Sequence, residues 1–267
     1  MPFPEDSPWS GAESIRVGMI VPSSNVTMER EVPAMLRARE AVAPERFSIH
    51  ASRVRMRSVT PAELAAMNVQ AEQAAVELGD AAPDAVVFAC LVAVMAEGPG
   101  AHRRIERQLA DAGAAAGWRG PVVSSAGALV ETLRLMEAKR VALVAPYLPR
   151  LTDQVCAYLA AEGIEVVDPV SLSVADNAAV GTLPQEDLLA LGDTLPRDVD
   201  AVVLSACVQM PSLGVIEAAE RRLGLPVVSA ATATLFQLLR RLGLGTRVPG
   251  AGRLLSGAFD RAPLAVR

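Results

Sequence analysis

DAVVFAC (residues 84–90) and DAVVLSAC (residues 200–207) are two nearly identical stretches of this 267-residue chain, and each ends in a cysteine. Short Val-rich runs of this kind are typical of strands buried on both faces of a parallel sheet. Two of the chain's three cysteines therefore stand at the same point of a repeated strand. This raises the question of whether a whole unit is duplicated, and what the two thiols do together.

Two further pairs of stretches repeat. RVGMIVP (16–22) matches RVALVAP (140–146), and PVVSSAGALV (121–130) matches PVVSAATATL (226–235). In chain order the three offsets are 124 residues (16 to 140), 116 residues (84 to 200) and 105 residues (121 to 226). Buried parallel strands are all Val-rich, so a single pair could arise by chance, whereas three pairs in the same order indicate duplication. The shrinking offsets suggest that the second copy has lost loop residues.

Short Val/Ile/Leu runs alternate with longer stretches of helical period, which indicates βαβ units around parallel sheets. Strands are expected at 16–21, 46–54, 84–89, 121–125, 140–145, 164–169, 200–206 and 226–230. Helices are expected near 26–39, 61–81, 99–116, 126–137, 150–162, 184–193, 213–223 and 231–242. The predicted fold is α/β, with two pseudo-twofold-related domains, each a four-stranded parallel sheet flanked by helices.

The domain boundaries follow from this repeat. Residues 15–126 are expected to form the N-terminal domain, joined by the C-terminal segment 233–267, and residues 127–232 the second domain. Residues 1–14 are acidic and Pro-rich without an apolar central segment, so they are expected to be flexible and not a secretory signal.

Composition restricts the partners and the compartment. Acidic residues outnumber basic ones by 30 to 25, and no basic run occurs, so nucleic acid and anionic membranes are poor candidate partners. The longest apolar run, at 85–96, is shorter than the roughly 20 residues that span a bilayer. An odd number of cysteines without a CxxC pair argues against disulfides or a zinc site. We expect a cytoplasmic protein with reduced thiols.

The duplication predicts where the two thiols lie. Ligands of open α/β sheets bind outside the carboxyl ends of the strands. Cys90 and Cys207 follow their predicted strands directly, so two halves related by a pseudo-twofold axis would bring both thiols to one shared crevice. Each also precedes a predicted turn into a helix, where N–H groups are expected to lower the pKa of a thiol and activate it. The third cysteine, Cys156, has the apolar context of an inert buried thiol.

The sequence lacks the motifs expected for nucleotide binding or metal binding. EGPGAH (97–102) is neither GxGxxG nor a Walker loop, so the nucleotide-binding loop is missing. The two histidines, His50 and His102, have no metal-ligand spacing, and His102 is expected to have a structural role. The predicted crevice instead has polar loops: PSSN (22–25), APYLPR (145–150) and ADNAAVG (175–181). They offer hydroxyl, amide and phenol groups, which together with backbone N–H groups can hold a small dianion. Asn25 and Asn177 could equally be an N-cap and a turn residue.

Several of these stretches together resemble the maleate isomerases (maleate cis–trans isomerases) of the aspartate/glutamate racemase superfamily. The resemblance extends over about residues 15–257, and it is specific, because racemases typically carry GNT and Cys-Thr motifs where this chain reads ACLV and ACVQ. The stretches that carry it are VGMIVPSSNVTMEREVPAML (17–36), FACLVAVMAEGPGAH (88–102), PVVSSAGALVETL (121–133), LSACVQMPSL (204–213) and SAATAT (229–234).

The resemblance implies a cofactor-independent conversion of maleate to fumarate through a succinyl-cysteine adduct, often within nicotinate degradation. Cys90 would be the nucleophile, and Cys207 the proton donor and acceptor on the opposite face. The substrate-binding residues of the family match positions in this chain, namely Asn25, Leu91, Val92, Tyr147, Asn177 and Val208. One departure is PSSNVT, where many relatives have PSSNTT; it leaves the asparagine in place.

The resemblance further implies a small dicarboxylate as the partner and a homodimer as the assembly, with no metal. Two alternatives remain open. One is another enzyme of the superfamily, a racemase or an arylmalonate-type decarboxylase; the decarboxylase would need only the second cysteine, so Cys90 argues against it. The other is a non-catalytic dicarboxylate binder that has inherited the crevice, which the retention of both thiols disfavours.

Overall fold

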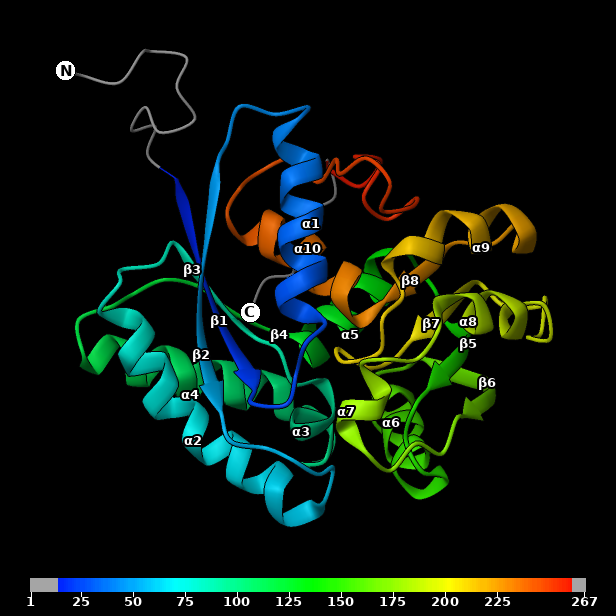
Figure 1. The fold of residues 1–267 in the computed structure, drawn as a ribbon, viewed down its shortest axis with the longest axis horizontal. Coiled ribbons are helices and arrows are strands. Elements are labelled where there is room, and N and C mark those ends of the chain that lie inside the picture. Colours follow the sequence, from blue (N-terminus) through cyan, green and yellow to red (C-terminus); the bar gives the residue numbers. More distant parts are fainter. Residues whose placement is uncertain (1–13, 261–267) are drawn as a thin grey trace.

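The computed structural model describes residues 14–260. Apart from Ser14, the N-terminal segment that we expected to be flexible lies outside these residues, and so does the end of the C-terminal segment. The described chain forms two four-stranded sheets, in which every strand pair is parallel (Figure 1).

The two sheets have the same topology. Their strand orders are β2-β1-β3-β4 and β6-β5-β7-β8, so the first strand of each half lies between the second and the third. The strands are β1 (Ile15–Pro22), β2 (Phe47–Val54), β3 (Ala85–Phe88), β4 (Val122–Ser124), β5 (Arg140–Ala145), β6 (Glu165–Ser171), β7 (Ala201–Ser205) and β8 (Val227–Ser229). All eight predicted strands are present, and the predicted fold class is confirmed.

Helices surround the sheets, and two of them were not expected. The helices are α1 (Met28–Glu40), α2 (Pro61–Gly79), α3 (Leu91–Met95), α4 (Ala101–Ala115), α5 (Ser125–Leu135), α6 (Pro149–Ala161), α7 (Asn177–Val180), α8 (Gln185–Gly192), α9 (Ile216–Leu223) and α10 (Ala230–Arg241). A 3-10 turn, η1 (Leu213–Val215), precedes α9. The short α3 is apolar all round, so its sequence resembles a continuation of β3. The four-residue α7 lies in a predicted loop. Within residues 14–260, no helix has the length and apolar character that crossing a membrane requires.

The repeated aspartate of the DAVV motif has the same role in both halves. The carboxylate of Asp84 accepts the backbone N–H of Arg16 at 2.7 Å, and that of Asp200 accepts the N–H of Arg140 at 2.8 Å. The backbone N–H groups of the two aspartates donate in return to the carbonyls of Arg16 and Arg140. Each aspartate therefore aligns the third strand of its half with the first, and this gives the repeat a structural reason.

The two halves meet at a pair of equivalent helices. α5 follows β4 and α10 follows β8, and a serine caps each helix: Ser124 accepts the N–H of Gly127, and Ser229 that of Thr232. The helices pack against each other, where Thr234 donates to the hydroxyl of Ser125 at 2.9 Å. Contact between equivalent elements is what an approximate twofold axis requires. α10 also contacts β3, β4 and α1, so the helix that follows the last strand of the second half packs against the first half.

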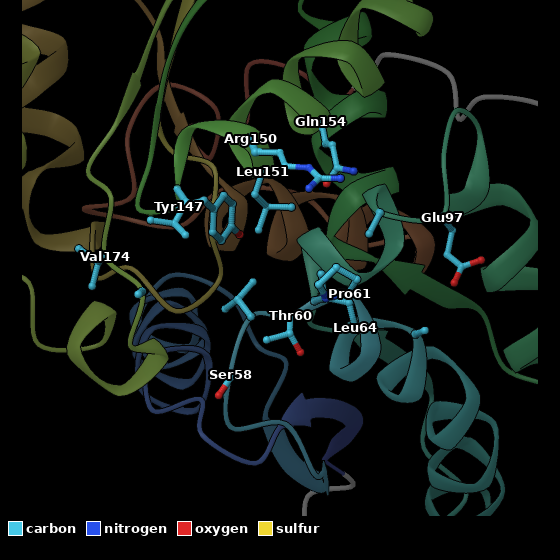
Figure 2. Close-up of a pocket in the computed structure, with 15 residues that line it drawn as sticks. Ser58, Thr60, Pro61, Leu64, Glu97, Tyr147, Arg150, Leu151, Gln154 and Val174 are labelled. Atoms are coloured by element: carbon cyan, nitrogen blue, oxygen red, sulfur yellow. The ribbon is translucent and has the colours of Figure 1, made fainter.

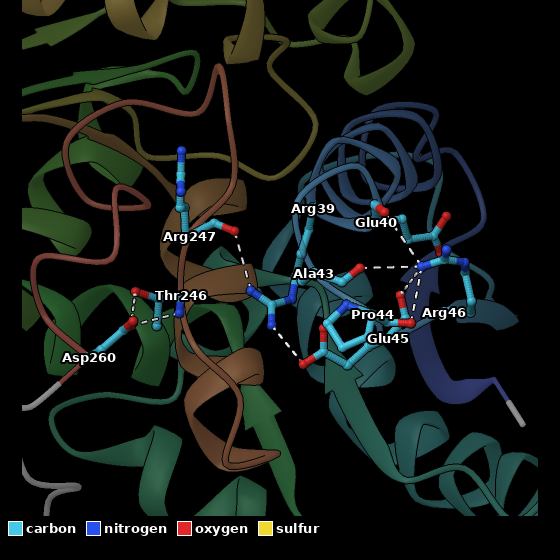
Figure 3. A network of polar contacts seen from close by, with 9 residues as sticks. All are labelled: Arg39, Glu40, Ala43, Pro44, Glu45, Arg46, Thr246, Arg247 and Asp260. Carbon is cyan, nitrogen blue, oxygen red and sulfur yellow. Dashed lines mark hydrogen bonds and ion pairs between the residues drawn. The ribbon is translucent and has the colours of Figure 1, made fainter.

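The chain beyond α10 lies against the first half (Figure 3). The guanidinium of Arg39, on α1, donates to the backbone carbonyl of Arg247 and forms an ion pair with Glu45 at 3.0 Å. Asp260 accepts both the hydroxyl and the N–H of Thr246, which holds this segment in a compact loop. The same segment also contacts the second half, where the backbone N–H of Arg253 donates to the carboxylate of Glu220 at 3.0 and 3.1 Å. The division into residues 15–126 with the segment from 233, and residues 127–232 as the second domain, therefore stays a proposal.

Candidate active site

A small cavity with about 10 Å³ of free volume lies at the carboxyl ends of the two sheets. All the residues predicted for the site line it: Asn25, Cys90, Leu91, Val92, Tyr147, Asn177, Cys207 and Val208. Four lining residues were not predicted: Pro22, Met56, Val59 and Gln209. The tertiary structure therefore brings together residues that are up to 187 positions apart in the sequence, from Pro22 to Gln209.

The two cysteines reach this cavity by equivalent routes. Each stands two residues beyond the third strand of its half, at the end of β3 or β7. The residue before each thiol extends the ladder, because Ala89 donates its N–H to the carbonyl of Ile20 at 2.8 Å and Ala206 to that of Val144 at 2.9 Å. The chain turns directly afterwards. Both cysteines are buried, with 2% and 5% of their surface exposed.

The environment of Cys90 is set by α3. Cys90 is the N-cap residue of this helix; its side chain makes no capping hydrogen bond, although the backbone N–H of Ala93 is near enough to lower the pKa of the sulfur. The first N–H groups of a helix have no partner within it. Those of Leu91 and Val92 therefore lie beside the thiol at the wall of the cavity, where an anion could accept them.

Cys207 lies in a turn that its neighbours hold in shape. The hydroxyl of Ser205 donates to the carbonyls of Cys207 and Met210, which closes the turn after β7. The sulfur accepts a hydrogen bond from the backbone N–H of Gln209 at 3.3 Å. Two further donor groups, the hydroxyl of Tyr147 and the backbone N–H of Met210, lie close enough to lower its pKa. The helical segment after this turn starts at Leu213, where a helix was expected, with the 3-10 turn η1 followed by α9.

The expectation that the turns lower the pKa of both thiols is wrong for this structure. Burial raises the pKa of Cys90 to about 12, and the single N–H donor from Ala93 offsets little of the cost of charging the sulfur. Burial also raises the pKa of Cys207, opposed by its three donors. The pKa of the Tyr147 hydroxyl is raised well above its ordinary value by burial, and by the nearby Cys207. Desolvation outweighs the helix terminus because both sulfurs are inside the protein.

The raised pKa of Cys90 leads to a prediction about its reactivity. Alkylation of Cys90 by iodoacetamide is expected to accelerate about tenfold per pH unit between pH 7 and 10, because only the thiolate reacts and its fraction grows at that rate. Peptide mass spectrometry in a Cys156→Ala background measures this rate. A plateau near pH 7 to 8 would show that the resting thiol is already ionised.

Asn25 both caps a helix and faces the cavity. Its side-chain oxygen accepts the backbone N–H groups of Thr27 and Met28 at 3.0 and 2.9 Å, at the start of α1. Its amide nitrogen donates to the carbonyl of Val208 at 3.2 Å, next to Cys207. The sequence left open whether Asn25 caps a helix or binds substrate, and one side chain can do both. Its oxygen faces the start of α1, and its amide N–H₂ is turned toward the cavity.

Asn177 and Tyr147 complete the polar wall. Asn177 is the first residue of α7, and the side chain of Asp176, the N-cap of this helix, accepts the N–H of Ala178. The side-chain amide of Asn177 donates to the hydroxyl of Ser24 at 2.7 Å. Tyr147 follows β5 and donates to the carbonyl of Ala206 at 3.2 Å. Among residues 14–260 no lysine or arginine lines this cavity, so an anion held by these residues would depend on neutral donors.

The remaining cysteine and both histidines lie away from the cavity. Cys156 is half-buried on α6 and lines a separate, open hollow. His102 is buried in α4, where its Nδ1 is 2.5 Å from the hydroxyl of Tyr158, and His50 contacts Ser48 on the outer strand β2. The structural role expected for His102 agrees with these contacts. Among residues 14–260, no three His, Cys, Asp or Glu side chains gather into a group that could hold a metal ion.

A larger chamber with about 410 Å³ of free volume, partly open to solvent, adjoins the cavity (Figure 2). Val59 and Tyr147 line both spaces and separate them. The chamber is mostly apolar and has one cationic side chain, Arg150 on α6. Its one carboxylate, Glu97, forms an ion pair with Arg104 at 3.0 Å. Because Arg104 neutralises this carboxylate, Arg150 is the cationic side chain that the chamber presents beside the cavity.

Two duplicated α/β halves that each contribute a buried thiol to one cavity define an enzyme of a two-cysteine class. The sequence matches the arylmalonate decarboxylase family model over residues 17–255. It is 50% identical to a maleate isomerase from Geobacillus stearothermophilus, over 93% of this chain and 100% of the relative.

Solved structures agree with this match. A cysteine-to-alanine variant of the maleate isomerase from Pseudomonas putida S16, solved with maleate, has 48% identity and a TM-score of 0.91, and the match covers 92% of this chain and 99% of that one. A cysteine-to-serine mutant of the Nocardia farcinica maleate cis-trans isomerase carries a covalently bound succinylcysteine intermediate. Its identity is 51% and its TM-score 0.87, over 90% of this chain and 98% of that one. The chain belongs to the family that the model describes and, within it, to the maleate isomerases.

Proposed function

We propose that this enzyme converts maleate to fumarate by reversible covalent addition of Cys90, without a cofactor. The observation that carries the proposal is the single cavity that Cys90 and Cys207 share with Asn25, Asn177 and Tyr147. Thiol addition turns the C=C bond of maleate into a single bond, about which the molecule can rotate. The succinylcysteine intermediate in the related Nocardia farcinica mutant supports the same chemistry here.

The two thiols have different roles in this proposal. Cys207 has three hydrogen-bond donors to its sulfur and Cys90 has one, so a shared negative charge is held better on Cys207. As the sulfur of Cys90 bonds to C2 of maleate, its proton moves to Cys207, and the electron pair of the double bond moves to C3 and its carboxylate. N–H groups beside that carboxylate stabilise the charge as an oxyanion hole does.

The second half of the reaction reverses the first. Cys207 protonates the carbanion at C3, which gives the succinyl adduct on Cys90 and leaves Cys207 as the thiolate. The C2–C3 bond rotates, the Cys207 thiolate removes a proton from C3, and the bond from C2 to the sulfur of Cys90 breaks, which releases fumarate and leaves Cys90 as the thiolate. The proton then returns from Cys207 to Cys90, which restores the starting state. We assign Leu91, Val92, Asn25, Asn177, Tyr147 and Val208 to holding the two carboxylates.

Proton NMR of the purified protein with maleate tests the proposal, because maleate and fumarate each give one vinyl singlet. The maleate singlet is expected to be replaced by the fumarate singlet without any added cofactor. An unchanged maleate singlet would contradict the proposal. Carbon dioxide release from an arylmalonate would favour the decarboxylase alternative, deuterium exchange into an amino acid would favour a racemase, and affinity without turnover would favour a binder.

The chamber leads to a prediction about substrate capture. The protein carries a net charge of −5 and would repel a dianion, so Arg150 is expected to attract the substrate. Arg150→Gln should raise KM about fivefold at low ionic strength, leave kcat unchanged, and lose this effect at high salt. The matched control is Arg119→Gln, which removes the same charge from an exposed position ahead of β4, at the opposite end of the strands. Equal effects of both changes would contradict a local role.

Three further expectations remain proposals: a homodimer, a cytoplasmic location and a place in nicotinate degradation. Light scattering tests the first, because a dimer has twice the 28.0 kDa mass of the chain.

A further inference from the structure

Gln209 was not predicted as a site residue, yet its side chain makes three hydrogen bonds in the cavity wall, as many as that of Asn25. It is 2% exposed, and every hydrogen-bonding group of its amide is used. The oxygen accepts the N–H of Val26 at 2.9 Å, and the nitrogen donates to the carbonyls of Ser24 at 2.9 Å and Asn177 at 3.0 Å. One amide thus joins the loop after β1 to the first residue of α7.

The backbone of Gln209 links the same loops to the thiol. Its N–H lies 3.3 Å from the sulfur of Cys207, and its carbonyl accepts the hydroxyl of Thr27 at 2.6 Å. The loop that carries Asn25, the helix that carries Asn177 and the turn that carries Cys207 therefore meet at one residue. A buried amide with all its partners satisfied is costly to disturb, because each lost bond leaves a buried polar group unpaired.

Gly181 gives independent evidence that the chain is shaped to accommodate the amide of Gln209. It ends α7 with an ordinary φ of −68°, so no backbone strain requires glycine there. A Cβ at this position would lie 2.8 Å from Nε2 of Gln209 and 2.7 Å from a methyl group of Val26. Only glycine leaves room for the amide to reach both loops.

We propose that Gln209 is a positioning residue, which holds Asn25 and Asn177 at the distance and orientation that bind the two substrate carboxylates. The proposal rests on the proposed function and deepens it. Because the two asparagines would contact the carboxylates both before and during the reaction, their displacement weakens the binding of substrate and transition state alike. That loss appears in KM and leaves kcat largely unchanged.

The test compares two changes that displace the amide by different means. Gln209→Glu keeps the shape and the acceptor but cannot donate to the carbonyls of Ser24 and Asn177. Gly181→Ala leaves Gln209 unchanged and crowds its amide. Each is expected to raise KM for maleate about tenfold, with kcat within about threefold of the wild type. The double variant should raise KM by less than the product of the two effects, because both act on one contact.

The matched control is Gly192→Ala at the end of α8, where an added Cβ would meet only two leucine methyl groups at 3.9 and 4.0 Å. Its KM should equal that of the wild type. KM does not depend on the fraction of folded protein, so a purely structural role of Gln209 would lower yield and Tm and leave KM unchanged.

Isothermal titration with succinate, a dicarboxylate that cannot undergo addition, provides a second measurement that is independent of turnover. Both variants are expected to bind it about tenfold more weakly than the wild type. Failure of the wild type to convert maleate would contradict the proposed function alone, and the succinate affinities would still test the positioning. If KM and the succinate affinity of both variants lie within twofold of the wild type, Gln209 has no positioning role.

Discussion

Cys90→Ala is expected to abolish both turnover of maleate and formation of a covalent adduct. Without the nucleophile no bond to C2 can form, and removing a nucleophile of this kind lowers kcat on the order of 10⁵-fold or more. Intact-mass spectrometry after incubation with maleate should show the unmodified mass, and NMR should show no fumarate. The loss of one buried sulfur should leave the fold in place, as near-ultraviolet circular dichroism can verify.

The control is Cys156→Ala, which removes a thiol from α6 outside the cavity and should change neither measurement. An adduct that persists in Cys90→Ala and maps to Cys207 would reverse the two assigned roles. Turnover retained at a tenth of the wild-type rate would contradict covalent catalysis by Cys90.

Cys207→Ser is expected to separate the two halves of the reaction. Addition of Cys90 to maleate needs a proton at C3 only once, whereas release of fumarate needs a base that removes a proton again. A serine hydroxyl is a far weaker base than a thiolate, so kcat should fall about 10³-fold, as for loss of a general acid–base group. The succinyl adduct on Cys90 should then accumulate to about one per chain.

Intact-mass spectrometry and peptide mapping measure the amount and the position of the adduct. Tyr147→Phe is the variant to compare with Cys207→Ser. It removes one of the three donors to the sulfur of Cys207 and should lower kcat by a much smaller factor without trapping adduct. If Cys207→Ser shows neither adduct nor turnover, Cys207 is needed already for the addition step. If its kcat equals that of the wild type, another group carries the proton.

The strand pattern, the duplication and the two cysteines could be predicted from the sequence, because each depends on local pattern. Val-rich runs bounded by turns and alternating with helical stretches favour buried strands, and DAVV repeats because Asp84 and Asp200 align the same strand pair. The two short helices were missed, since α3 and α7 have five and four residues and their periodicity cannot be recognised over so few positions.

The acid–base character of the thiols could not be predicted in this way. A turn before a helix suggests a lowered pKa, but the degree of burial decides the sign, and burial depends on both halves closing over the sulfur. Gln209 was missed for a similar reason. Its three partners, at 24, 26 and 177, lie 32 to 185 residues away, and only its place directly after Cys207-Val208 hinted at a role.

By itself the sequence determined two α/β halves and the position of one thiol at the end of the third strand of each, because local periodicity and hydrogen-bond capacity decide strand, helix and turn. The tertiary structure alone decided that both sulfurs are desolvated in one cavity without a cation, and that one glutamine amide holds its loops together. Desolvation and hydrogen-bond satisfaction depend on every group that surrounds an atom, and those groups come from all parts of the chain.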